Sequence, residues 1–224
     1  MRVRLPPRAQ KFYRFKNYIL MEIVPKDSRY IPFSQQPYCC VPTSIQMVMY
    51  RHNIALLPAE LLGYHLGLTV PKKAAKFFWN SHIGKRNPSQ LRPMSGYGTQ
   101  IFEENYEPNK VFKKLGIPLK MDLAPIINFN DFSEFKKYLL ELSKKDFDIL
   151  LCFHHGTLIN DKTIDNGHVV VLDKIYPTSN KIRFIDPTRG PKWKIFSMIK
   201  VYKAMKAHPN QKVAGFWELF YTKT

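Results

Sequence analysis

The sequence predicts an α+β fold, with a mainly helical N-terminal part followed by a mostly antiparallel sheet. Apolar residues recur at helical spacing in the first part of the chain, whereas the period changes to two from Phe147 onward. Turn residues at Asn166-Gly167 and Ser179-Asn180 separate the alternating segments, as they do between successive antiparallel strands. The 224 residues are enough for one large domain that buries a core without disulfide bonds.

The first predicted helix begins at Cys40. Pro42 suits its first turn, because an amide hydrogen at that position has no partner within the helix. Apolar side chains cover most faces of this helix: Val41, Ile45, Met47, Val48, Met49 and Tyr50. A helix that is apolar nearly all round lies inside the protein, so we expect this one to be central and buried.

The middle of the chain predicts a mixture of elements. We expect short helices at Pro58–Leu66 and around Asn109–Leu115, irregular structure over residues 71–102, and a strand at Ile117–Ile126. Asp131-Phe132-Ser133-Glu134 has the spacing of a capping box. The helix that it begins has an apolar face formed by Phe132, Phe135, Leu139 and Leu142.

The C-terminal part predicts the rest of the sheet. Alternating segments indicate strands at Phe147–Phe153, His168–Ile175 and Lys181–Ile185. We expect a basic helix at about Lys194–Ala207 and a last strand at about Gly215–Tyr221.

Residues 1–30 are predicted to be a basic N-terminal extension, with eight basic and two acidic side chains, and residues 31–224 to be the folded domain. The whole chain has 35 Lys and Arg against 17 Asp and Glu, a formal net charge of +18. A lysine-rich solvated surface is the simplest interpretation of this surplus. Among partners it favours an acidic peptide or protein. Nucleic acid is less favoured, because no Walker loop, zinc-finger spacing or ribonucleoprotein motif accompanies the charge.

The sequence predicts no membrane span, because no apolar run reaches the roughly 18 residues that one requires. The N-terminal apolar patch at Tyr18–Met21 is cut short by Glu22, unlike the apolar core of a secretory signal. The three cysteines, Cys39, Cys40 and Cys152, are a poor disulfide framework because two of them are adjacent. We therefore expect a reducing, cytoplasmic location.

Three residues are candidates for chemistry. Cys40 begins a helix, where the positive end of the dipole favours a nucleophilic thiolate. His168 opens a strand after a glycine turn, a rigid position that suits a general base. Asp186 ends the apolar row of Ile182 and Phe184, so it either initiates a turn or accepts a hydrogen bond from an imidazole.

Each of these residues alone also fits an inert role: a buried cysteine, a core histidine or a turn-initiating aspartate. Their order along the chain is more informative, because papain-type enzymes have a cysteine on an early helix and its partners on a distant sheet. Gln35 precedes the cysteine closely. Its amide NH₂ is placed to join the Cys40 backbone amide at a developing oxyanion.

These motifs resemble a known family. Gln35-x₄-Cys40-x-Pro42-Thr43-Ser44, Gly167-His168-Val169-Val170-Val171 and Ile185-Asp186-Pro187 are together similar to the bacteriocin-leader (double-glycine) peptidases and their stand-alone relatives. These proteins are papain-like cysteine peptidases. The resemblance implies a papain-like fold whose catalytic helix packs on the sheet. It also implies Cys40 as nucleophile, His168 as base, Asp186 as orienting residue and Gln35 as oxyanion donor.

The chain departs from the family pattern at two points. Val41 stands where the family usually has glycine, and the glutamine spacing differs by one residue, so Gln36 (or neither glutamine) remains an alternative donor. Cys39 is an alternative nucleophile, although the proline at plus two favours Cys40.

No metal or cofactor is predicted. The segment Cys152-Phe153-His154-His155 invites a zinc interpretation, but a strand would present at most two of its ligands on one face. The sequence contains no second paired motif that would complete such a site.

The sequence thus predicts a cysteine peptidase-like enzyme that cleaves a peptide or amide bond through a thioester on Cys40. Hydrolysis and transfer to another acceptor both remain open. Tyr97 and Gln100, in the loop Gly96-Tyr97-Gly98-Thr99-Gln100, are candidate substrate contacts, with a surface turn as the alternative. The alternative function is a catalytically degenerate papain-fold binding module that uses its basic face on an acidic protein or nucleic acid.

Overall fold

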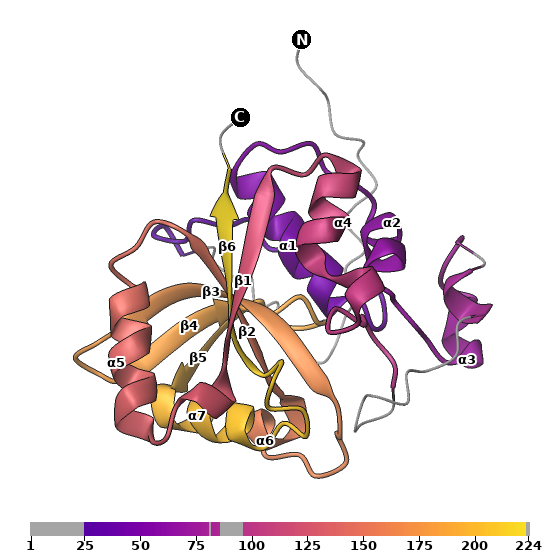
Figure 1. The fold of residues 1–224 in the computed structure, drawn as a ribbon. Helices are drawn as coiled ribbons and strands as arrows, with labels where there is room; N and C mark the ends of the chain where they lie inside the picture. Colours follow the sequence, from indigo (N-terminus) through magenta and orange to yellow (C-terminus); the bar gives the residue numbers. More distant parts are fainter. Residues whose placement is uncertain (1–24, 81, 86–95, 223–224) are drawn as a thin grey trace, which may run out of the picture.

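A computed structural model describes residues 25–80, 82–85 and 96–222 (Figure 1). The helices are α1 (Cys40–Arg51), α2 (Ala59–His65), α3 (Lys72–Ala75), α4 (Pro108–Leu115), α5 (Phe132–Leu142), α6 (His155–Ile159) and α7 (Met198–Lys206). The strands are β1 (Leu119–Pro125), β2 (Asp148–His154), β3 (Gly167–Tyr176), β4 (Lys181–Ile185), β5 (Trp193–Ser197) and β6 (Gly215–Tyr221). The predicted α+β class is confirmed.

The strands form one six-stranded sheet in the order β1-β6-β2-β3-β4-β5, and every neighbouring pair is antiparallel. The register between β3 and β4 shifts between Leu172 and Lys174, which makes Asp173 the extra residue of a bulge. This bulge bends β3 beyond the half of the strand that carries His168.

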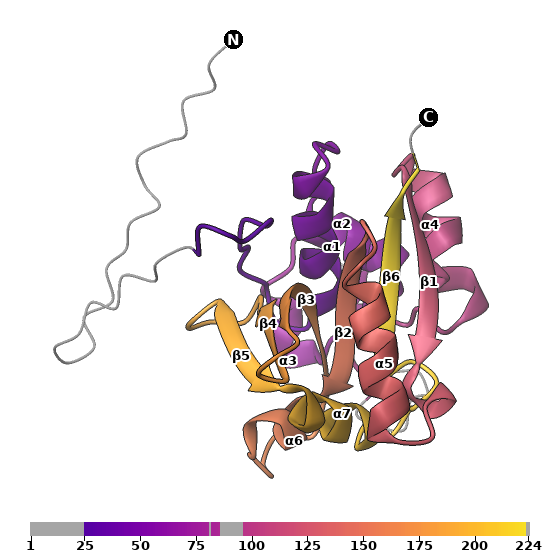
Figure 2. The ribbon, with the colours of Figure 1, turned by 90° about the vertical axis from the view of Figure 1, so that its left-hand side faces the viewer.

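Helices cover both faces of the sheet, so two cores form. Along β3, Val169 and Val171 belong to the core that includes α1, whereas Val170 and Leu172 belong to the core that includes α5 and α7. Figure 2 shows α5 and α7 on one side of the sheet and α1 on the other. A strand with apolar residues on both faces is typical of a sheet covered twice.

Helix α1 is the buried central helix that the sequence predicts. Its aliphatic and methionine side chains are buried, whereas Tyr50 is 49% exposed, and its first residue, Cys40, lies where the helix meets β3. The structure also agrees with the predicted start of α5 and shows how α4 ends. The predicted capping box forms in part: the Asp131 side chain accepts from the Glu134 amide at 2.9 Å, whereas the Glu134 carboxylate accepts from the amide of Asn130, one residue before the N-cap, at 2.9 Å. Gly116 ends α4 in a left-handed conformation.

The prediction of a helix over Lys194–Ala207 is wrong in its first turn. Residues 194–197 belong to β5, which pairs with β4 at the edge of the sheet, and the helix begins only at Met198. Basic side chains are common on edge strands, where they oppose pairing with another chain. Sequence composition alone therefore did not separate this strand from the basic helix that follows.

The predicted irregular region, residues 71–102, contains the short helix α3 and a 3₁₀ turn at Ile83–Lys85, while residues 86–95 lie outside the described residues. Helix α6, directly after β2, was not predicted. Its first turn is capped by His154, whose imidazole accepts from the Thr157 amide at 3.1 Å.

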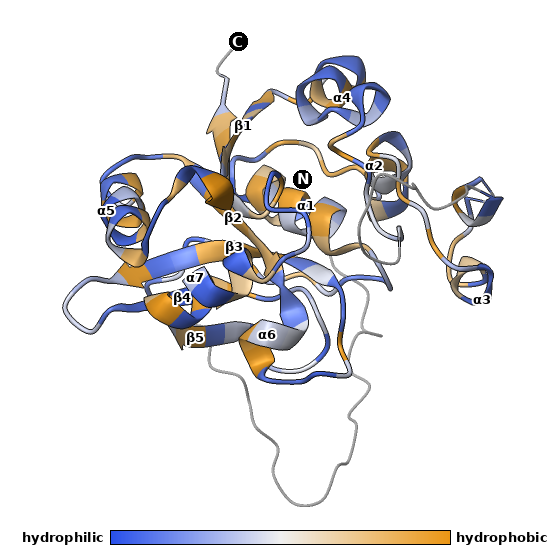
Figure 3. Ribbon diagram, turned by 60° about the horizontal axis from the view of Figure 1, so that its bottom comes forward, coloured by the Kyte–Doolittle hydropathy of each residue, from blue (hydrophilic) through white to orange (hydrophobic). Residues whose placement is uncertain are grey.

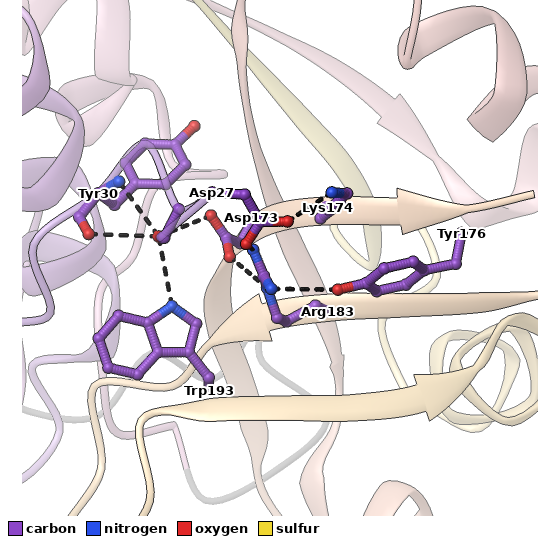
Figure 4. A network of polar contacts seen from close by, with 8 residues as sticks. Asp27, Tyr30, Asp173, Lys174, Tyr176, Arg183 and Trp193 are labelled. Carbon is purple, nitrogen blue, oxygen red and sulfur yellow. Dashed lines mark hydrogen bonds and ion pairs between the residues drawn. The ribbon is translucent and has the colours of Figure 1, made fainter. Parts of the chain in front are cut away.

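Residues 1–24 of the predicted N-terminal extension also lie outside the described residues, but residues 27–36, here called the strap, run along the sheet to the Cys40 helix. Figure 4 shows its first anchor. Arg183 donates to Asp27 at 2.8 Å and also binds the bulge residue Asp173, which accepts from the Ser28 hydroxyl at 2.8 Å. The indole of Trp193 donates to Ser28 at 3.3 Å.

A second anchor of the strap is buried. Tyr30 is 2% exposed and its hydroxyl donates to Asp148, which is fully buried and also binds Arg51 and His52. A buried carboxylate is tolerated only when such partners compensate its lost hydration. The strap is therefore part of the core. None of the helices in the described ranges is long and apolar enough to cross a bilayer.

Candidate active site

A sharp turn places Cys40 at the start of α1. Tyr38 has a left-handed backbone conformation (φ 67°), which is uncommon for a residue other than glycine. The turn buries Cys39 completely and leaves Cys40 partly exposed. Cys39 packs with Leu68 and Val70, and burial strongly raises the pKa of its thiol. Cys40 is therefore the better nucleophile of the two.

The structure brings Cys40, His168 and Asp186 together. The Cys40 thiol and the His168 imidazole line the same cavity and are close enough that each changes the pKa of the other. His168 Nε2 lies 2.8 Å from Asp186 Oδ1, which leaves Nδ1 as the ring nitrogen that faces the sulfur. Cysteine, imidazole and carboxylate thus form one connected series of interacting groups.

The surroundings of this series favour an ion pair. Burial opposes the thiolate, but hydrogen bonds from His168 and from the Val169 and Val41 backbone amides outweigh it, so the pKa of Cys40 lies below its ordinary value. Burial also opposes the imidazolium, but hydrogen bonds to Asp186 and Cys40 raise the pKa of His168 to about 9. Both changes stabilise a thiolate beside an imidazolium.

Asp186 is held firmly at the end of β4. Its Oδ1 accepts from the Thr188 amide at 2.9 Å and the Thr188 hydroxyl at 2.7 Å, and its Oδ2 accepts from Lys194 Nζ at 2.7 Å. Burial would raise the pKa of this carboxyl, but the bonds to His168, Lys194 and Thr188 hold it well below its usual range. Asp186 is therefore a fixed negative charge that orients the imidazole.

Gln35 lies at the end of the strap and lines the same cavity as Cys40. Its backbone amide donates to the Pro187 carbonyl at 2.9 Å, so the loop after Asp186 also fixes the glutamine. The alternative donor, Gln36, is engaged elsewhere: its amide nitrogen donates to Glu60 at 3.0 Å. Of the two glutamines, Gln35 is the one available to a substrate at Cys40.

A cavity of about 730 Å³ opens beside Cys40 and His168. Aromatic and aliphatic side chains form much of its wall, and Tyr38 and Tyr97 meet edge to face there with ring centroids 6.0 Å apart. A mainly apolar cavity with a few polar groups is typical of small-molecule and peptide sites.

The two predicted substrate contacts have different positions. Tyr97 lines the cavity, whereas Gln100 does not. Gln100 is 3% exposed, and its amide nitrogen donates to the carbonyls of Gly96 and Gly98, each at 2.9 Å. Gln100 therefore shapes the loop that presents Tyr97. Val41 is buried against the core and its side chain also reaches the cavity wall.

Two residues of the site were not predicted from the sequence. The His155 ring stacks on His168 with centroids 4.6 Å apart and an interplanar angle of 27°. Burial and the charge of His168 lower the pKa of His155 to about 4, so this ring is neutral near pH 7. The predicted strand ends at Phe153 and no helix was predicted after it, whereas β2 ends at His154 and the chain turns directly into α6, which begins at His155. Lys194 was missed because it was assigned to a helix.

Among the described residues, His155, His168 and Asp186 offer ligand atoms within 4.8 Å of one another, a spacing compatible with a metal ion. His168 and Asp186 are, however, hydrogen-bonded to each other, and the Lys194 ammonium occupies the second carboxylate oxygen. That positive charge disfavours a cation at the same place. The geometry fits an oriented imidazole better than a metal site.

No model of a known protein family matches the chain, and a search of curated proteins returns no match. The chemistry of the site is therefore interpreted from its own residues.

Proposed function

We propose that this chain is a papain-like cysteine acyl-transfer enzyme that cleaves a peptide or amide bond through a thioester on Cys40. The observation that carries the proposal is the meeting of a thiol, an imidazole and a buried carboxylate at the edge of an open cavity, with the imidazole hydrogen-bonded to the carboxylate. The packing of α1 against β3 also fits a papain-like arrangement, because Cys40 begins the helix and His168 lies near the start of that strand.

The first half of the reaction forms the thioester. The Cys40 thiolate attacks the carbonyl carbon of the substrate, and the electron pair of the C=O bond moves onto oxygen. The Cys40 backbone amide lies in the first turn of α1, where amides have no partner within the helix. Together with the Gln35 side chain it is placed to stabilise that oxyanion. His168 then gives its proton to the leaving amine as the C–N bond breaks.

The second half releases the acyl group. The neutral imidazole takes a proton from water, and the resulting hydroxide attacks the thioester carbon. The C–S bond breaks, a carboxylic acid leaves and the thiolate–imidazolium pair is restored. An amine or thiol acceptor in place of water makes the same site a transferase.

Selective alkylation tests the proposal, with Cys39 and Cys152 as internal controls in the same molecule. At about pH 6 an ordinary thiol is almost fully protonated, so iodoacetamide should modify Cys40 far faster than the other two cysteines. The rate at each cysteine is measured by mass spectrometry of the digested protein. His168→Ala should slow the modification of Cys40 selectively.

The competing function is a binding module with a degenerate site. It predicts slow and similar alkylation of all three cysteines, with no effect of His168→Ala. That result would remove the basis for catalysis.

A further inference from the structure

Residues 70–80 and 82–85 form a small lobe, here called the α3 lobe, that the proposed reaction does not use. Val70, Ala74, Phe78 and Ile83 pack with Leu68 and Cys39 into a separate small core. In Figures 1 and 3 helix α3 stands at the periphery, away from the sheet and its covering helices. The lobe therefore has its own inner face and a large solvent-facing surface.

Two aromatic residues cover the outside of the lobe. Phe78 is 8% exposed, but its neighbours Phe77 and Trp79 are 54% and 75% exposed. Within the described residues they are the two most exposed large apolar side chains. Aromatic side chains gain much from burial, so two of them displayed side by side indicate an interaction surface.

Hydrogen bonds to a buried carboxylate hold the backbone of this segment in place. The carboxylate of Glu60, which is 2% exposed, accepts from the backbone amides of Trp79 at 3.1 Å and Asn80 at 3.2 Å. The same carboxylate accepts from the Gln36 side chain at 3.0 Å. The backbone that presents Trp79 is thus fixed to α2 and to the end of the strap.

The charged side chains of the lobe itself are all basic, and the Glu60 carboxylate behind it is buried. Lys72, Lys73 and Lys76 are exposed beside the aromatic pair, and residues 71–102 contain six basic and no acidic side chains. Lys76 Nζ lies 5.4 Å from the centre of the Phe77 ring. Aromatic rings flanked by lysines are typical of protein surfaces that sit at the headgroup level of a bilayer.

We propose that the α3 lobe docks on an anionic lipid surface. Trp79 and Phe77 enter the headgroup region, and Lys72, Lys73 and Lys76 lie against acidic headgroups. Single-stranded nucleic acid fits less well, because it needs a charged groove that tracks the backbone, whereas these rings lie on a projecting segment. Pro71 and Lys73 also line the cavity, so docking places the cavity entrance near the headgroup layer.

Sedimentation of the full chain with vesicles tests this proposal independently of any catalysis. The chain should bind vesicles of phosphatidylcholine mixed with phosphatidylserine and not vesicles of phosphatidylcholine alone. Each lysine near an anionic surface contributes roughly a fivefold factor in binding, so the triple variant K72E/K73E/K76E should bind at least about a hundredfold more weakly. Phe77→Ala with Trp79→Ala should also weaken binding.

The matched control is K113E/K114E/K137E, which changes the net charge equally at exposed lysines of α4 and α5. It should keep most of the binding. Equal losses in the two triple variants would overturn the proposal, because net charge or another basic segment would then explain the attraction. An unchanged urea-unfolding midpoint shows in each variant that the fold is intact.

Tryptophan fluorescence gives a second readout. Trp217 is buried and Trp193 is half-buried with its indole bonded to Ser28, so insertion of Trp79 should shift the emission to shorter wavelength when anionic vesicles are added. Trp79→Phe should abolish that shift and retain binding, because phenylalanine also partitions into the interface. Binding without a Trp79-dependent shift would overturn the proposal. So would binding of a single-stranded oligonucleotide with no binding of vesicles.

Discussion

Asp186→Asn removes the negative charge beside the imidazole and leaves its shape nearly unchanged. In the native site the pKa of His168 is raised from 6.5 to about 9, and the Asp186 hydrogen bond is the first of the interactions that raise it against burial. That difference corresponds to roughly 3 kcal/mol of preference for the imidazolium. Since a neighbouring carboxylate changes a pKa by about 1–3, the asparagine variant should lower the pKa of His168 by about that amount.

The consequence is a smaller population of thiolate at acidic pH. The Cys40 thiolate exists there because the imidazolium beside it is stable, so a less basic imidazole shifts the proton back to sulfur. We expect the rate constant of Cys40 alkylation at about pH 6 to fall roughly tenfold. Near pH 9 the ordinary ionisation of the thiol takes over, and the two proteins should converge.

The measurement is the pH profile of iodoacetamide alkylation at Cys40, followed by mass spectrometry. Asp165→Asn is the matched control, because Asp165 also lies at the cavity and pairs with a histidine, His154, at 3.1 Å. It should leave the profile unchanged. A native profile in the Asp186 variant would refute the role of this carboxylate, and an equal effect of both substitutions would show a general response to lost charge.

Three further changes test other parts of the structure. Gln35→Ala should slow acylation by p-nitrophenyl acetate about a hundredfold in a stopped-flow burst and leave iodoacetamide alkylation unchanged, because only acylation forms an oxyanion. Tyr30→Phe leaves the buried Asp148 with one partner fewer and should cost about 1–3 kcal/mol in urea unfolding. His155→Phe keeps a ring on His168 and removes a group whose pKa is about 4. The native protein loses stability as the pH falls from about 6.5 to about 4, because only the unfolded chain readily takes up that proton. The melting temperature of the variant should therefore fall less over this pH range than that of the native protein.

Sequence periodicity predicted the elements with long apolar patterns. The buried α1 and the valine-rich β3 carry enough apolar residues that their burial decides both type and position. Alternation along β4 also placed Asp186 correctly, at the buried end of the row of Ile182 and Phe184. The hydrogen bond between His168 and Asp186 follows from the pairing of these two strands.

What the sequence missed lies where tertiary contacts override local pattern. Trp193–Ser197 has no distinct apolar face, and only its pairing with β4 makes it a strand. The position of His155 depends on the place where β2 ends, which a local pattern locates only within a few residues. Gly167 is explained by a residue far along the chain, since a Cβ there would lie 2.6 Å from His208 Nε2.

The loop after β4 fixes both the imidazole and the proposed oxyanion donor. The loop after β4 carries Asp186, which orients the imidazole, and the carbonyl of Pro187, which accepts from the Gln35 backbone amide. The strap that ends at Gln35 is in turn anchored by Tyr30 on the buried Asp148. An oxyanion donor supplied by a strap is precise only when the strap is fixed at both ends. Loss of the Tyr30–Asp148 hydrogen bond or of the bond between Gln35 and Pro187 is therefore expected to reduce acylation. The thiolate–imidazolium pair rests on α1, β3 and β4, so it should remain formed.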